Sequence, residues 1–335
     1  MAYTQENLYF SVATPLGPDA LILVRFTGEE RLSGLFHFHL EMQSETPDLD
    51  FTAVVGQGAT ITIDLADDTQ RYVHGIVTSF RQGGRDAVFT TYYAELRPAF
   101  WLLTLSADCR IFQEMTVLEI ITTLLGEKGV TDTKDSTTGT HPAREYCVQY
   151  NETAFDFCSR LMEEEGIFYF FEHVDGKHTL VLADDVSAFT PCPGAATVAY
   201  GTEALWVQQN VLTRATVSES VLPGSFALDD FFFETPSTDL MVSTDGNAAD
   251  SGAPKRRIYE YPGRYTKKDR GTDLSKLRIE SRETPGKVLS GEGYCRAFLP
   301  GYTFTLEEHY RQDANADYTL ARVLHTFEWD HYENA

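Results

Sequence analysis

The sequence predicts a β-rich α+β fold in which one β-unit occurs twice, near the two ends of the chain. Residues 58–64 and 301–307 alternate apolar and polar side chains with matching parity. Each segment is followed by a second extended run, at residues 73–80 in the first case and 320–327 in the second. Alternation with a period of two is typical of strands with one buried face. We therefore interpret the two segments as copies of one domain, with other material inserted between them.

The composition indicates a globular protein with more than one domain. The 335 residues are 42% hydrophobic and 13% aromatic, and a chain of this length exceeds what a single core usually organises. The formal charge is −23, from 27 basic and 50 acidic residues. Because such a charge repels phosphate groups, neither a nucleic acid nor an anionic membrane is an expected partner.

The cysteines and the N-terminal residues indicate a protein that folds in the reducing cytoplasm. The five cysteines are odd in number, widely spaced and without a CxxC pair, so neither a zinc site nor a disulfide framework is predicted. Residues 1–11 contain no basic segment followed by an apolar one, so no signal peptide is predicted. No apolar run approaches the ~20 residues of a membrane span.

The first hundred residues indicate strands and turns, and helices follow. Extended runs occur at 21–26 and 36–42, separated by glycine-containing turns. Thr116 and Glu119 have the spacing of a capping box, and the apolar residues that follow share one helical face. These features predict a first helix near 116–128.

A second helix and a hairpin are predicted next. The helix extends over about 153–165 and ends at Gly166. Residues 167–183 then form two extended runs around the pair Asp175-Gly176, which supports the positive φ angles of a type I′ turn.

An aromatic run follows an expected strand at 211–217. Because one strand face cannot bury the three consecutive rings of Phe231, Phe232 and Phe233, one ring should face another domain or another chain. Residues 241–257, rich in Ser, Asp, Gly and Ala, read as a surface loop or linker.

Two histidine pairs resemble parts of metal sites, but neither is complete. His37 and His39 alternate on one strand face, and no third ligand is evident in the sequence. His173 and His178 should lie opposite each other across the hairpin, with Cβ atoms ~5 Å apart. Because a metal site needs a full ligand set, we expect no bound metal and no cofactor.

The sequence also predicts no catalytic centre. Glu163, Glu164 and Glu165 precede a helix end, where adjacent side chains diverge and are usually solvated. The motifs G-x-S-x-G, H-E-x-x-H and G-x-x-x-x-G-K-[ST] are absent.

The strand parity of the repeat separates core residues from surface residues. A shift by one residue would bury the threonines and expose the large apolar side chains, so the register is well specified. The side chains assigned to the cores are Ile61, Ile63, Phe304 and Leu306. Those assigned to the outer faces are Thr60, Thr62, Thr303 and Thr305. These four threonines and the three phenylalanines are the candidate protein-interface residues.

Four blocks of sequence occur in an order that resembles a known family. They are Glu95–Pro98 with Cys109–Gln113, Tyr150–Thr153 with Arg160–His173, Tyr259–Tyr265, and Glu292–Ala297. The chain resembles the VgrG spike proteins of type VI secretion systems. The resemblance falls on the family's N-terminal region, which is similar to the hub of contractile phage tails. The oligonucleotide-fold domain and the β-helical needle of the family lie outside it, so membrane puncture is not assigned to these residues.

The resemblance implies a phage-tail-hub-like fold with two related barrel-like tube domains and inserted helices and hairpins. A homotrimer of such chains makes a ring of quasi-sixfold symmetry. The expected first tube domain comprises residues 1–100 with about 205–240, and the second comprises 101–204 with about 290–335. Residues 241–289 are expected to form a loop and a small insertion.

The implied function is structural. The chain would be the trimeric spike base that caps the hexameric Hcp tube, contacts baseplate proteins and carries an effector or adaptor protein. It would fold in the bacterial cytoplasm and be exported by the type VI machine. One alternative is the hub of a related contractile injection particle or phage tail. Another is a secreted β-rich hydrolase or carbohydrate-binding protein, which the aromatic content and acidic charge would also suit.

Overall fold

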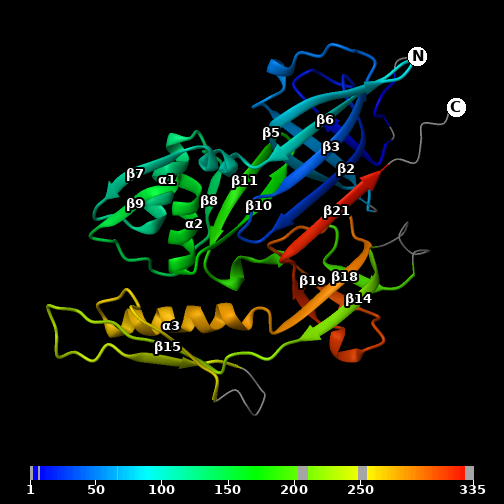
Figure 1. Ribbon diagram of the computed structural model, residues 1–335. Coiled ribbons are helices and arrows are strands. Elements are labelled where there is room, and N and C mark those ends of the chain that lie inside the picture. Colours follow the sequence, from blue (N-terminus) through cyan, green and yellow to red (C-terminus); the bar gives the residue numbers. More distant parts are fainter. Residues whose placement is uncertain (1–2, 7, 66, 203–209, 248–254, 329–335) are drawn as a thin grey trace. The chain divides into compact units, whose positions relative to one another are not determined.

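The computed structural model (Figure 1) describes residues 3–6, 8–65, 67–202, 210–247 and 255–328. Within these ranges, no helix has the length and apolar character that crossing a membrane requires.

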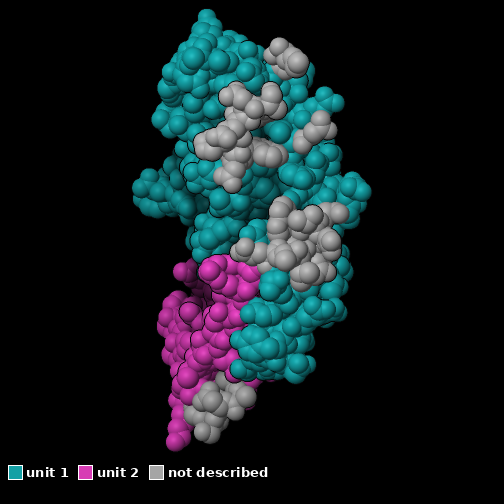
Figure 2. Space-filling view, turned by 90° about the vertical axis from the view of Figure 1, so that its right-hand side faces the viewer, with its two compact units in different colours: residues 1–212, 293–335 teal, residues 213–292 magenta. Residues whose placement is uncertain are grey.

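The chain divides into two compact units. Unit 1 comprises residues 1–212 and 293–335, and unit 2 comprises residues 213–292 (Figure 2). The chain leaves unit 1 along β14 (Val211–Glu219) and returns to it along β18 (Lys287–Tyr294).

The first layer of unit 1 is a curled antiparallel sheet of seven strands (Figure 1). In spatial order the strands are β1 (Phe10–Ala13), β4 (Gly58–Asp64), β5 (Gln70–Arg85), β6 (Thr90–Arg97), β3 (His37–Ser44), β2 (Ile22–Arg31) and β21 (Arg322–Glu328). The sheet curls until side chains from its two edge strands meet, because the ring centres of Phe10 in β1 and Phe327 in β21 lie 5.9 Å apart. The predicted β-rich, barrel-like character is confirmed.

The two predicted copies of the β-unit differ in their pairing. β4 and β5 pair directly, as the sequence predicts. In the second copy, β19 (Tyr302–Glu307) pairs with the short β20 (Asp317–Thr319), whereas β21 pairs with β2 in the first sheet (Figure 1). If the second copy repeated the first, residues 301–307 would pair with residues 320–327, and they do not. The alternation of a strand reports which face is buried, but it does not identify the neighbouring strand.

The predicted parity of the core residues is confirmed in both segments. Each of the assigned apolar side chains is at most 5% exposed, and these are Ile61, Ile63, Phe304 and Leu306. The burial of one such side chain contributes about 1.5–3 kcal/mol to stability.

β19 belongs to a second large sheet. In order its strands are β12 (Thr190–Pro191), β19, β13 (Thr197–Tyr200), β14 and β18, with β20 beside β19. β14 lies in this second sheet, whereas β21, near the end of the chain, lies in the seven-stranded sheet. The division into two related tube domains stays a prediction.

A helical layer follows β6 in the sequence. α1 (Val117–Glu127) and α2 (Ala154–Glu165) confirm the two predicted helices. The capping box of α1 is present in both directions, and the Asp156 N–H donates to the Thr153 hydroxyl at the start of α2. Gly166 ends α2 with a φ of 73°, a left-handed conformation that favours glycine.

Short strands and turns complete unit 1. The strands are β7 (Ala107–Phe112) paired with β9 (Cys147–Thr153), and β10 (Phe168–Val174), β11 (Lys177–Ala183) and β8 (Thr133–Asp135) in a three-stranded sheet. Short 3-10 helices occur at Phe51–Ala53, Ala99–Leu105, Val186–Ala188 and Gln312–Ala314. The β10–β11 hairpin turns at Asp175-Gly176, and Gly176 has the predicted positive φ of 69°.

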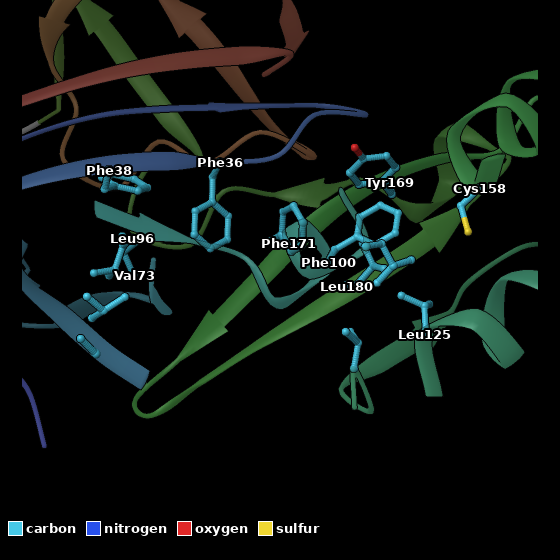
Figure 3. Close-up of a cluster of buried hydrophobic side chains, with 14 of the residues drawn as sticks. Phe36, Phe38, Val73, Leu96, Phe100, Leu125, Cys158, Tyr169, Phe171 and Leu180 are labelled. Atoms are coloured by element: carbon cyan, nitrogen blue, oxygen red, sulfur yellow. The ribbon is translucent and has the colours of Figure 1, made fainter. Parts of the chain in front are cut away.

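One continuous apolar core joins the seven-stranded sheet to the helical layer (Figure 3). Phe38 and Leu96 lie on the sheet side of this core, and Leu125 and Cys158 lie on the helical side. Aromatic rings fill the region between them, including Phe171 of β10, whose ring centre lies 5.0 Å from that of Phe36. The hairpin is therefore part of the core.

Unit 2 is a small α+β unit in which a helix packs on a sheet. Its strands are β15 (Ser225–Leu228), β16 (Val242–Asp245) and β17 (Arg257–Glu260), and its helix is α3 (Lys268–Glu283). The sequence analysis treated 241–257 as a loop, which is wrong for β16; residues 248–254 lie outside the described residues. It also missed α3, whose sequence is polar on most sides and buries only Gly271, Leu274, Ser275 and Ile279.

Candidate interaction surfaces and polar clusters

The aromatic run in unit 2 lies in a turn after β15. Phe231 and Phe233 are 61% and 74% exposed, whereas Phe232 packs against the core of unit 2. Two rings face outward, one more than the sequence argument required. Neighbouring exposed aromatic side chains are typical of surfaces that another protein covers.

The outward assignment of the threonines is correct for three positions and wrong for Thr60. Thr60 is buried because the tip of the β10–β11 hairpin covers it, and the Gly176 N–H donates to its hydroxyl at 3.3 Å. It cannot contact a partner ring. The other three are half-buried and keep their place as interface candidates: Thr62, Thr303 and Thr305.

A series of hydrogen bonds joins His173 and His178 of this hairpin to His74 of β5. The Ala99 N–H donates to His178 Nε2 at 2.9 Å, so a neutral His178 carries its proton on Nδ1. That proton points at His74 Nδ1, 2.9 Å away. The His74 backbone N–H donates in turn to His173 Nδ1 at 3.2 Å. Backbone amides thus set the tautomers, and three of the four ring nitrogens of His173 and His178 are occupied by hydrogen bonds.

His173 connects these hydrogen bonds to a buried ionic cluster centred on Glu30. His173 Nε2 lies 3.6 Å from one carboxylate oxygen of Glu30. Arg71 and His325 donate to the other oxygen, with His325 Nε2 at 2.7 Å. Arg71 also donates to the backbone carbonyl of Arg296 at 3.0 Å. The cluster connects β2, β5, β10 and β21.

Burial and neighbouring charge shift the pKa values of these groups. Burial by itself raises the pKa of the Glu30 carboxyl, but the Arg71 charge and the two imidazoles hold it well below its ordinary value. Burial and the neighbouring His173 and His74 lower the pKa of His178 to about 3. His178 is therefore neutral at pH 7, as its hydrogen bonds require.

The sequence analysis missed Glu30, Arg71, His74 and His325, although it contained a signal for one of them. Arg71 shares the inward parity of Val73 and Val77 on β5, so a charge occupies a position where the pattern calls for an apolar residue. A charge buried at such a position requires a partner. The sequence does not say which residue supplies that partner.

The acidic side chain that lies beside His37 and His39 is that of Glu95. β3 and β6 are neighbours in the seven-stranded sheet, and His39 stands directly opposite Glu95. His37 Nε2 lies 3.1 Å from Glu95 Oε2, and the guanidinium of Arg97 lies 3.4 Å from the same oxygen. Burial and the charges of Arg97 and His39 lower the pKa of His37, although Glu95 opposes this shift.

The expectation of solvated glutamates at the end of α2 is wrong for Glu165. Glu163 is exposed, but Glu165 is buried and accepts a hydrogen bond from Arg144 at 2.7 Å. His141 lies between Glu165 and Asp184, with Nδ1 3.4 Å from Glu165 and Nε2 3.0 Å from Asp184. These contacts attach the segment before β9 to α2 and to the end of β11, which indicates a structural role.

Curled β-sheets with inserted helices define a tail-hub class of protein, and solved structures share this fold. One is the E. coli c3393 protein, a component of the type VI secretion system described as similar to the T4 tail proteins gp27 and gp5. It matches with a TM-score of 0.68 at 19% identity, over 92% of this chain and 71% of that chain. A chain of a Francisella PdpA–VgrG complex matches with a TM-score of 0.56 at 10% identity, over 96% of this chain and 53% of that chain.

The comparison of sequences shows the family to which this chain belongs. The family described as phage tail baseplate hub (GPD) matches residues 29–331, and the chain belongs to this family. The type VI secretion system spike protein VgrG1b of Pseudomonas aeruginosa is 35% identical over 334 residues, which are 99% of this chain and 45% of the relative. The chain thus spans a little less than half the length of that relative. The resemblance to the hub-like region of the spike proteins is confirmed.

Proposed function

We propose that this chain is the hub region of a type VI secretion spike, which assembles as a homotrimer and caps the hexameric Hcp tube. One observation carries the proposal: the chain matches a type VI spike protein along 99% of its length at 35% identity. The curled sheets of unit 1 support it, because a ring-shaped hub needs barrel-like walls. In this reading the chain also contacts baseplate proteins and an effector or adaptor protein.

The half-buried threonines and the exposed phenylalanines are the proposed contact residues. Thr62, Thr303 and Thr305 lie on strands of the two large sheets, and we assign them to contacts with the partner ring. Phe231 and Phe233 we assign to a contact with another chain, because large interfaces are enriched in aromatic side chains. Thr60 is not part of this assignment.

The oligomeric mass tests the proposal. Mass photometry of the chain carrying a C-terminal β-helical needle should give three chains per particle, and purified Hcp hexamers should bind to that particle. An obligate interface of this kind usually buries more than ~2,000 Å². A strictly monomeric needle-bearing protein would contradict the trimer, and a trimer that binds no Hcp would contradict the assignment to the type VI tube.

The second candidate function is that of a hub in a phage tail or a related contractile particle. The family match favours this candidate, because the family is described as a phage tail baseplate hub. The two candidates differ in the tube protein that the trimer binds. Binding to Hcp supports the type VI reading, and binding to a phage tube protein in the absence of Hcp binding supports the other. In both readings the role is structural and not enzymatic, and the chain folds in the cytoplasm. In the type VI reading it is then exported by the type VI machine.

A further inference from the structure

We propose that His37, His39 and Glu95 form a binding site for a divalent transition-metal ion, with zinc as the ion that the ligand set suits best. The proposal is independent of the trimer and of the tube contact. It replaces the expectation of no metal, because that expectation depended on a missing third ligand.

The geometry of two central strands brings the donors together. His37 and His39 lie two residues apart on β3 and so share its outer face, and Glu95 is paired with His39 on β6. One ligand atom from each residue lies within 4.8 Å of the other two. In a tetrahedral zinc site with metal–ligand distances of 2.0–2.2 Å, ligand atoms are about 3.4 Å apart. The 3.1 Å between His37 Nε2 and Glu95 Oε2 is already close to this value, so small side-chain rotations complete the set.

The donors are accessible from solvent. The side chains of His37 and Glu95 are 27% and 35% exposed, and His39 is exposed. The other histidine pair differs, since His173 and His178 use three of their four ring nitrogens in hydrogen bonds inside the core.

The donor set selects the class of ion. Two imidazole nitrogens and one carboxylate oxygen suit zinc, nickel, copper, cobalt and ferrous iron, whereas magnesium and calcium prefer oxygen donors alone. Three protein ligands leave at least one coordination position for water or for a side chain of another protein. A bound ion would connect β3 and β6 through their side chains.

The guanidinium of Arg97 lies against two of the three donors. Its Nη2 lies 3.3 Å from His37 Nε2 and 3.4 Å from Glu95 Oε2, so its charge now balances the carboxylate. The guanidinium also lies 5.4 Å from the ring centre of Trp101. This aromatic face offers it a favourable position when the ion displaces it. Arg97 therefore competes with the metal ion for His37 and Glu95, which lowers the affinity of the site but does not prevent binding.

Titration of the full chain with Co²⁺, after removal of metal by a chelator and without a histidine tag, tests the proposal. One Co²⁺ per chain should bind with visible absorption bands, and Zn²⁺ should displace it. His39→Ala and Glu95→Gln should each weaken binding by at least about tenfold. Arg97→Gln should strengthen it by about tenfold, because it removes a positive charge within contact distance of the ion.

Glu41→Gln is the matched control. Glu41 lies on the same outer face of β3, two residues after His39, and it is not part of the cluster. Its substitution removes the same charge as Glu95→Gln and should leave the affinity unchanged. Circular dichroism shows whether each variant is folded. Binding that is absent, that survives in the folded variant His37→Ala/His39→Ala, or that weakens equally in Glu41→Gln and Glu95→Gln overturns the proposal.

Discussion

The buried carboxylate of Glu30 allows a quantitative prediction of stability. Glu30→Gln removes the charge but keeps the size of the side chain. It leaves the guanidinium of Arg71, whose side chain is 4% exposed, without a counter-charge in the interior. The loss of one partner of a buried ion pair costs about 3–5 kcal/mol, because the remaining charge has lost both its water and its partner. We expect a loss in this range.

A double-mutant cycle separates the ion pair from general damage to the core. Arg71→Met alone should also cost about 3–5 kcal/mol, since it leaves Glu30 charged and buried. Glu30→Gln/Arg71→Met removes both charges, so its cost should fall short of the sum of the single costs by at least ~2 kcal/mol. Glu29→Gln is the control, because Glu29 pairs with Arg322 at 2.9 Å on the surface and should contribute less than ~1 kcal/mol.

Urea unfolding followed by tryptophan fluorescence measures each cost. Single costs that add to within ~0.5 kcal/mol in the double variant would refute the reasoning, because additivity means that the two charges do not interact. The pH dependence gives a second check. The pKa of Glu30 is lower in the folded state, so its contribution is present above the unfolded value of about 4.3 and is lost as the pH falls through the lower folded value. Glu30→Gln should lack this dependence.

Three further predictions follow from individual side chains. The pKa of His178 is lowered to about 3 in the folded protein, against about 6.5 in the unfolded chain. The free energy of unfolding should therefore fall by roughly 2 kcal/mol between pH 6.5 and pH 5. Urea unfolding of His178→Asn should show a weaker pH dependence. Ile63→Asp should unfold unit 1, whereas Thr62→Asp should leave the circular dichroism spectrum unchanged and weaken Hcp binding; equal losses of structure would contradict the assigned faces. Phe231→Ser/Phe233→Ser should change stability by less than ~1 kcal/mol but lower the trimer fraction in mass photometry, and an unchanged trimer would remove both rings from the interface.

The sequence by itself determined the local elements. The capping box at Thr116 marks the start of α1, Gly166 ends α2, and Asp175-Gly176 turns the hairpin, because each depends on interactions within a few residues. The parity of Ile63 and Leu306 was also readable, since burial of one face leaves a period of two in the sequence. A helix such as α3, with few apolar residues on any face, leaves no such pattern.

The tertiary structure decided which elements meet. β2 lies near the start of the sequence and β21 near its end, and the two strands pair. This pairing places His325 beside Glu30, although the two residues are 295 positions apart in the sequence. The neighbouring positions of β3 and β6 bring Glu95 to His37, and the hairpin tip buries Thr60. Strand order and register depend on the packing of the whole sheet, whereas a strand's own residues specify only its faces. The ionic cluster and the candidate metal site therefore appear only when the strands are placed side by side.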